Sequence, residues 1–285
     1  MAEIGCNHKG DMDIAHEMIN TAKLCGADAV KFQKRNPKEL LTDDEYNNPH
    51  PNPANSYGST YGEHREYLEL DVDQHAQLKQ WCDEAGIIYS TSVWDVTSAK
   101  DIAGLKPEFI KIPSASNQHF EMLGWLRDSF DGQIQISLGM TTRDEEEKVV
   151  SFFEEAGRGK DILIYSCTSG YPVPFEDICL NEILRLRETF GDRVGGIGFS
   201  GHHLGIAADV AAMTLGADWI ERHFTLDRTW KGTDHAASLE PDGLRRLCRD
   251  VKHVSRALAY KDQEILPIEQ AQRDKLKWLR DRDPA

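Results

Sequence analysis

The sequence predicts a single (β/α)8 TIM barrel, and three observations favour that fold. Strand-like and helix-like segments alternate along almost the whole chain, and eight of each can be distinguished. The length of 285 residues suits one barrel of roughly 250 residues. No GxGxxG motif follows the first strand, which removes the main argument for an open doubly wound sheet. We therefore expect a barrel domain over residues 1–262 and a charged helical tail over residues 263–285.

The expected strands are short apolar runs, and the segments between them space their apolar residues by three and four, as helices do. The strands are expected at residues 2–5, 29–33, 87–92, 109–113, 133–138, 162–167, 194–200 and 219–224. The helices are expected at residues 13–25, 72–85, 97–105, 119–130, 143–156, 175–190, 205–215 and 241–260. A segment rich in proline and glycine, residues 34–70, interrupts the alternation and predicts a long loop. It would either line the barrel mouth or make contacts between subunits.

Composition excludes several classes of partner. A net charge of −15 leaves no basic footprint for nucleic acid or for an anionic membrane. No apolar run approaches the roughly 20 residues of a membrane helix. The chain opens directly into a strand without a signal peptide, and its six cysteines are scattered without a CxxC pair. We therefore expect a cytoplasmic protein with reduced thiols.

Polar side chains stand at the end of every expected strand, where barrels of this kind place their active sites. One serine or threonine would be explained as the cap of the next helix. Helix capping does not explain polar residues at all eight strand ends, because each buried polar atom without a hydrogen-bond partner destabilises the fold by roughly 1–3 kcal/mol. The sequence therefore predicts an active site at the barrel mouth.

Two lysines give the sharper signal. Lys31 and Lys111 lie inside apolar strands, where a lysine must find an anion or shift its pKa. Serine and threonine hydroxyls at neighbouring strand ends would complete a cradle for a phosphate and a carboxylate, and they are Thr91, Ser114, Ser137 and Ser200. A Schiff-base lysine and a buried ion pair with Asp or Glu are the second and third interpretations.

Two histidines, His202 and His223, follow neighbouring expected strands. Adjacent strands lie roughly 4.8 Å apart, so both imidazoles could reach one divalent metal ion. The alternative is that they are core residues or acid–base groups. Asp234, in the loop after the last strand, would contact substrate hydroxyls or serve only as a turn residue.

Several of these residues occur in ordered motifs. They include Ala-Glu-Ile-Gly-Cys-Asn-His, Val-Lys-Phe-Gln, Ile-Lys-Ile-Pro-Ser, Ser-Cys-Thr-Ser-Gly-Tyr-Pro, Gly-Phe-Ser-Gly-His-His and Glu-Arg-His-Phe-Thr. From Ala2 to about Leu247 the chain resembles the sialic acid synthase (N-acetylneuraminate synthase) family. The resemblance implies condensation of phosphoenolpyruvate with an open-chain sugar aldehyde to give a nonulosonic acid and phosphate. It also implies a divalent metal, manganese before magnesium or cobalt.

The resemblance also assigns roles to individual residues. Glu3 would act in acid–base catalysis, and His202 and His223 would bind the metal. Phosphoenolpyruvate would be held by Lys31, Thr91, Lys111, Ser114, Ser137 and Ser200. The sugar would be contacted by Gln33, Tyr171, Asp234 and Ser116.

Two departures from the family pattern bear on the acceptor. Ser116 stands where the family has a carboxylate, and the family's small C-terminal antifreeze-like domain is not found in this sequence. Both an N-acetylmannosamine-like and a non-acetylated aldose therefore stay open, and so does a homo-oligomer. The competing functions are a pyruvate-using, metal-dependent barrel aldolase or lyase, and a catalytically silent sugar-binding barrel.

Overall fold

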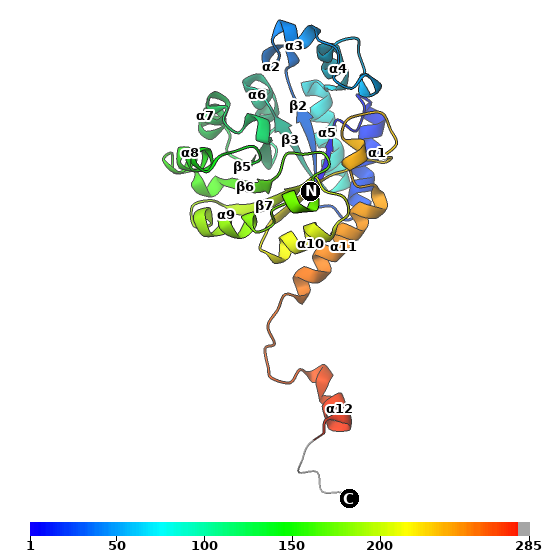
Figure 1. Ribbon diagram of the computed structural model, residues 1–285, viewed down its shortest axis with the longest axis vertical. Coiled ribbons are helices and arrows are strands. Elements are labelled where there is room, and N and C mark those ends of the chain that lie inside the picture. The colour runs from blue at the N-terminus through cyan, green and yellow to red at the C-terminus, as the bar shows by residue number, and fades with distance from the viewer. Residues whose placement is uncertain (279–285) are drawn as a thin grey trace, which may run out of the picture.

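The computed structural model describes residues 1–278 and contains a closed barrel of eight parallel strands, β1 to β8 in chain order (Figure 1). The expected (β/α)8 fold is confirmed, and each expected strand is present with its ends shifted by at most a residue or two. The strands are β1 (Ala2–Gly5), β2 (Ala29–Lys34), β3 (Ile88–Val93), β4 (Phe109–Ile112), β5 (Gln133–Ser137), β6 (Ile162–Cys167), β7 (Gly196–Gly201) and β8 (Trp219–His223).

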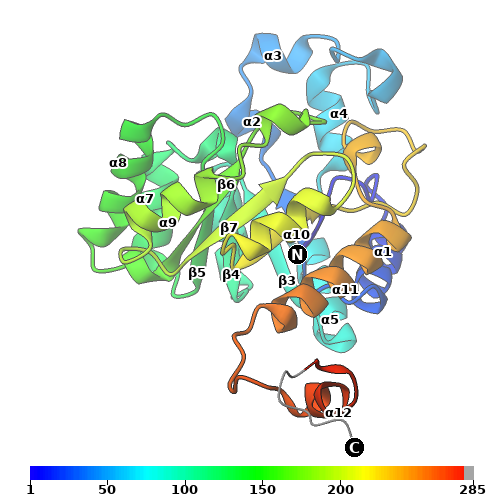
Figure 2. The ribbon, with the colours of Figure 1, turned by 60° about the horizontal axis from the view of Figure 1, so that its bottom comes forward.

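A ring of helices surrounds the barrel, as Figure 2 shows from a second direction. They are α1 (Met12–Leu24), α5 (Val72–Ala85), α6 (Val96–Gly104), α7 (Phe120–Ser129), α8 (Arg143–Glu154), α9 (Glu182–Phe190), α10 (Ala207–Thr214) and α11 (Pro241–Ala257). The expected helix over 175–190 is shorter than predicted. A 3-10 turn, Phe175–Asp177, comes first, and α9 begins only after Cys179, whose left-handed φ of 53° interrupts a helix.

The segment 34–70 is not the unstructured loop that the sequence predicts. It folds into α2 (Pro37–Leu40), α3 (Asp43–Asn47), a 3-10 turn and α4 (Tyr61–Leu68). Capping boxes begin α3 and α4. The side chains of Thr42 and Thr60 each accept a hydrogen bond from the backbone N–H of the glutamate three residues later, and the side chain of that glutamate accepts one from the backbone N–H of the threonine. In Figure 1 these helices lie together at the top of the view, beyond the end of β2.

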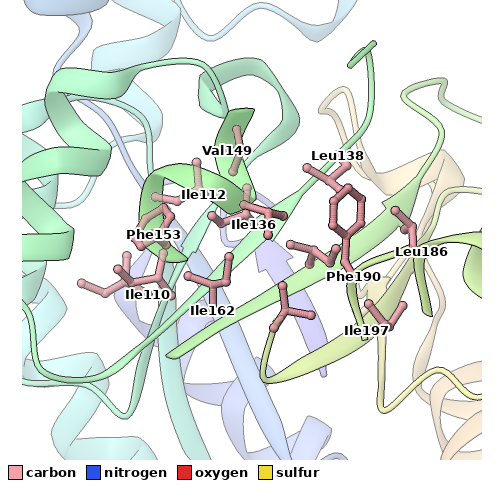
Figure 3. Close-up of a cluster of buried hydrophobic side chains, with 14 of the residues drawn as sticks. Ile110, Ile112, Ile136, Leu138, Val149, Phe153, Ile162, Leu186, Phe190 and Ile197 are labelled. Atoms are coloured by element: carbon pink, nitrogen blue, oxygen red, sulfur yellow. The ribbon is translucent and has the colours of Figure 1, made fainter. Parts of the chain in front are cut away.

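The hydrophobic core lies between the strands and the helices (Figure 3). Because side chains alternate along a strand, Ile110 and Ile112 face the helices while Lys111 between them faces the barrel interior. Phe153 of α8 and Phe190 of α9 pack on the same outer face. Burying each such side chain contributes about 1.5–3 kcal/mol, so this alternation also determines which residues reach the interior.

The C-terminal region continues beyond the barrel. The helix α12 (Pro267–Leu276) follows α11 and lies apart from the ring of helices in Figure 1. It falls within the expected tail, whose residues 279–285 lie outside the described part of the chain. Over residues 1–278, no helix combines the length and apolar character needed to cross a bilayer.

A buried histidine on α5 should make the protein sensitive to acid. His75 Nδ1 lies 2.8 Å from the Tyr89 hydroxyl, whereas Nε2 has no partner. Burial lowers the pKa of His75 from 6.5 to about 3. The unfolded chain therefore binds the proton first, and the stability from neutral His75 is lost progressively as the pH falls from 6.5 towards 3.

We expect the wild-type protein to lose unfolding free energy faster than His75→Gln over this range, by up to about 1.4 kcal/mol per pH unit. Urea unfolding at a series of pH values measures the difference. A matched variant, His253→Gln on the exposed face of α11, should follow the wild-type curve. Parallel curves for wild type and His75→Gln would contradict the assignment.

Candidate active site

A cavity of about 360 Å³ opens at the carboxyl ends of the strands, where the sequence predicts the active site. Almost all of the predicted site residues line it. They are Glu3, Lys31, Gln33, Lys111, Ser114, Ser137, Tyr171, Ser200, His202, His223 and Asp234.

The structure does not bring Thr91 and Ser116 to this cavity. Thr91 lies on the outer face of β3, where its hydroxyl donates to the Tyr89 hydroxyl at 2.7 Å. The next residue, Ser92, faces inward and accepts a hydrogen bond from Lys31 Nζ at 2.6 Å. Ser116 is turned towards the carbonyl of Trp94, to which it donates at 3.1 Å. The predicted placement of both residues is therefore wrong, for Thr91 by one step of the strand alternation.

Both interior lysines belong to a buried network of ion pairs. Lys31 Nζ lies 2.5 Å from Glu3 Oε2 and 3.7 Å from Glu221 Oε1. Lys111 Nζ lies 2.7 Å from Glu221 Oε2 and 3.4 Å from the centre of the Tyr165 ring. The lysines thus face the cavity, as an anion cradle requires, and are also paired with carboxylates, which is the third interpretation above.

The pKa values of the two carboxylates in this network are shifted in opposite directions. Burial raises the pKa of Glu3 more than the neighbouring Lys31 lowers it. Burial acts on Glu221 in the same direction, but Lys111 and Lys31 together outweigh it and lower the pKa. Burial lowers the pKa of Lys111 despite its contact with Glu221. Environments that separate the pKa values of two carboxylates are typical of acid–base sites. Glu3 is the one more readily protonated.

The imidazoles of His202 and His223 lie side by side, with ring centroids 5.5 Å apart. His202 Nδ1 donates to the Thr168 carbonyl at 3.0 Å. Burial acts to lower the pKa of His202, but its contacts with Cys167 and Thr168 outweigh burial and raise it. Burial lowers the pKa of His223 to about 4, so this ring is neutral near pH 7, and its Nδ1 is buried without a partner. The unpartnered nitrogen of His223 and the His202 ring beside it, which also contacts the Cys167 thiol, fit a shared divalent metal ion.

In the described part of the chain, no third His, Cys, Asp or Glu joins the two histidines as a metal ligand. Within residues 1–278 no three His, Cys, Asp or Glu side chains are placed to hold one ion together. A metal bound by His202 and His223 would therefore keep several positions for water and substrate.

The cavity also contains residues that had no predicted role in the site. Ser92 and Glu221 share the inward register of the predicted residues, so strand alternation could have found them. Cys167 lies at the end of β6, near Ser114. Arg35 and Arg65 come from the segment 34–70, where no periodic pattern signals their position.

A glycine is required beside the predicted serines. The Gly139 backbone N–H donates to Ser114 Oγ at 3.1 Å. A Cβ atom at this position would lie 2.5 Å from Ser169 Oγ and 2.6 Å from Ser114 Oγ, closer than such contacts allow. Any larger residue would therefore displace hydroxyls that line the cavity.

Together, the closed barrel and the charged cavity at its strand ends define a (β/α)8-barrel enzyme. The comparisons with known proteins are more specific, because the NeuB family model matches residues 18–263. The chain belongs to the NeuB family. It is an enzyme of the same sialic acid synthase-like transferase class as the curated synthases that it resembles.

Individual relatives show the extent of the similarity. N-acetylneuraminate-9-phosphate synthase of Homo sapiens is 39% identical over 277 residues, which cover 97% of this chain and 75% of the relative. N,N'-diacetyllegionaminic acid synthase of Campylobacter jejuni is 31% identical over 259 residues, 90% of this chain and 76% of the relative. The crystal structure of N-acetylneuraminic acid synthetase from Leptospira borgpetersenii aligns with a TM-score of 0.81 and 27% identity, covering 96% of this chain and 90% of that one.

Proposed function

We propose that this protein condenses phosphoenolpyruvate with an open-chain sugar aldehyde, giving a 3-deoxy-2-keto sugar acid and phosphate. The observation that carries the proposal is the meeting of two lysines, two carboxylates and several hydroxyls in one cavity of a NeuB-family barrel. The names of the relatives, synthases of N-acetylneuraminate 9-phosphate and of diacetyllegionaminic acid, support the same type of reaction.

The reaction balances with the residues present. The methylene carbon of phosphoenolpyruvate forms the new bond to the aldehyde carbon, and the aldehyde oxygen takes up a proton. Water adds to the former enol carbon, and phosphate leaves from the resulting tetrahedral centre as the ketone forms. Lys31 and Lys111 would offset the negative charge of phosphoenolpyruvate, with Ser114, Ser137 and Ser200 as hydrogen-bond donors.

Glu3 is our candidate for the proton transfers. Its raised pKa favours a protonated side chain near the aldehyde oxygen, and Lys31 at 2.5 Å would stabilise the carboxylate after transfer. Glu221 has the opposite role, since its lowered pKa keeps it ionised between the two lysines. It would hold both ammonium groups at the phosphoenolpyruvate end of the cavity.

His202 and His223 would hold a divalent metal, which we propose to be Mn²⁺. Such an ion supplies Lewis acidity, which polarises the aldehyde oxygen. The side chains of Gln33, Tyr171 and Asp234 are proposed to contact the sugar.

The acceptor is proposed to be a phosphorylated aldose. The human and mouse relatives are named for a product with phosphate on position 9. Condensation adds three carbons ahead of the aldehyde carbon, so position 9 of the product corresponds to the terminal oxygen of a six-carbon acceptor. That acceptor would bring a second phosphate into the site.

The purified protein should release phosphate from phosphoenolpyruvate only when a suitable aldose and Mn²⁺ are both present. A panel of C5, C6 and amino-sugar aldoses, free and phosphorylated, would be screened by phosphate release and by product mass. A product heavier than the aldose by one pyruvate is expected. Condensation of pyruvate itself without phosphate release would instead identify an aldolase. Sugar binding without turnover would identify a silent barrel.

A further inference from the structure

We propose that Arg65, supported by Arg35, is the specificity-determining cation that binds the acceptor's phosphate at the rim of the cavity. This inference rests on the proposed function and assigns its second anion to particular residues. Both guanidinium groups line the same cavity as the interior lysines. Arg35 lies at the start of the segment 34–70 and Arg65 lies near its end, so neither comes from the interior of a strand.

The position of each cation along its element separates two ends of the cavity. Lys31 and Lys111 lie within β2 and β4, so their ammonium groups stand at the floor. Arg35 follows the last residue of β2, and Arg65 lies on α4, beyond the strand ends. A substrate that spans the cavity would thus meet lysines at one end and arginines at the other.

The charges at the two ends are balanced differently. The two lysines are paired with Glu3 and Glu221, and Arg35 Nη1 lies 3.4 Å from Glu69 Oε1. Arg65 lines the cavity without an ion pair to any carboxylate of residues 1–278. In a protein of net charge −15, a cation that faces a cavity without a carboxylate at ion-pair distance is a natural partner for an anionic ligand group.

Local contacts hold the Arg65 side chain in place without neutralising it. Its Nε donates to the Tyr61 hydroxyl at 3.0 Å, and its guanidinium carbon lies 4.9 Å from the centre of the Tyr61 ring. Tyr61 is one turn earlier on α4, so this contact follows helical spacing. The guanidinium retains donors for a phosphate, whose oxygens match its fork geometry.

Arg65 also stands close to the proposed sugar-binding loop. The Tyr57 hydroxyl donates to the Lys231 carbonyl at 2.5 Å, which joins the segment 34–70 to the loop that carries Asp234. Asp234 and Arg65 line the same cavity. A sugar whose hydroxyls contact Asp234 would direct a terminal phosphate to the Arg65 side of the rim.

The test compares Arg65→Ala, Arg65→Lys and the matched control Arg249→Ala, which changes an exposed arginine on α11. Steady-state KM and kcat would be measured with N-acetylmannosamine 6-phosphate and with N-acetylmannosamine, at saturating phosphoenolpyruvate and Mn²⁺. Arg65→Ala should raise the KM for the phosphorylated sugar about 10- to 100-fold. The KM for the free sugar and for phosphoenolpyruvate should stay within about twofold, Arg65→Lys should recover part of the loss, and Arg249→Ala should match wild type.

An equal loss with both sugars, or a selective rise in the KM for phosphoenolpyruvate, would overturn the assignment. A wild-type enzyme that shows no preference for the phosphorylated sugar would also overturn the assignment of Arg65. The proposed condensation of phosphoenolpyruvate with a sugar aldehyde would still stand in that case. Calorimetric titration of N-acetylmannosamine 6-phosphate into each protein supplies a readout that needs no turnover. Unchanged affinity in Arg65→Ala would refute the role of Arg65. Failure of phosphoenolpyruvate to react with any aldose would instead refute the proposed function.

Discussion

Replacing Lys111 with methionine should reduce kcat/KM for phosphoenolpyruvate by about 100- to 1,000-fold. Lys111 is almost fully buried, lies 2.7 Å from Glu221 and faces the floor of the cavity. Methionine has a similar length but no charge, so the phosphoenolpyruvate end would lose one of its two ammonium groups. Phosphate release at varied phosphoenolpyruvate concentrations measures the effect.

A second variant separates catalysis from stability. Lys111→Met alone leaves the buried Glu221 without its nearest cation, which should cost about 3–5 kcal/mol of unfolding free energy. The double variant Lys111→Met/Glu221→Gln removes both charges and should recover most of that stability but not the activity. Lys100→Met, an exposed lysine on α6, serves as the matched control. Near-normal activity in the folded double variant would remove Lys111 from the phosphoenolpyruvate site.

Chelation should abolish turnover, and Mn²⁺ should restore it. Within the described chain the metal would have only His202 and His223 as clustered ligands, so EDTA should remove it readily. His223→Ala should lower both metal affinity and kcat/KM, the latter by about 100-fold or more. Metal content after dialysis and phosphate release before and after adding Mn²⁺ measure these effects.

The matched control for the metal experiment is His253→Ala, an exposed histidine on α11. It should bind metal and turn over as the wild type does. Full activity of EDTA-treated wild-type protein would contradict the metal assignment. If His223→Ala lost activity while metal content was unchanged, His223 would be an acid–base group rather than a ligand.

The strands and most of the inward-facing residues could be predicted from the sequence because both depend on local patterns. Alternating apolar residues around Lys111 indicate a strand, and they also determine that the lysine faces away from the helices. The same rule was misapplied at Thr91, where the neighbouring Ser92 has the inward register. The segment 34–70 was predicted as a loop, although the pairs Thr42–Glu45 and Thr60–Glu63 have the spacing of capping boxes, which marks the starts of two helices.

The remaining features depend on contacts between distant parts of the chain. The partner of Lys111 is Glu221, 110 residues away in sequence, and only closure of the barrel brings the two together. Arg65 lines the cavity from α4, which lies outside the barrel strands, and no periodicity in the sequence indicates that position. Pairings of this kind follow from topology, which local propensity does not specify.

The contrast between the floor and the rim of the cavity has a consequence for how this enzyme could change. Lys31 and Lys111 are carried by strands whose opposite faces form the hydrophobic core, so altering those strands endangers folding itself. Arg65 sits on a short appended helix that takes no part in the barrel. Selection could therefore exchange one sugar preference for another by rebuilding this appendage, while the proposed machinery for the three-carbon donor is inherited intact.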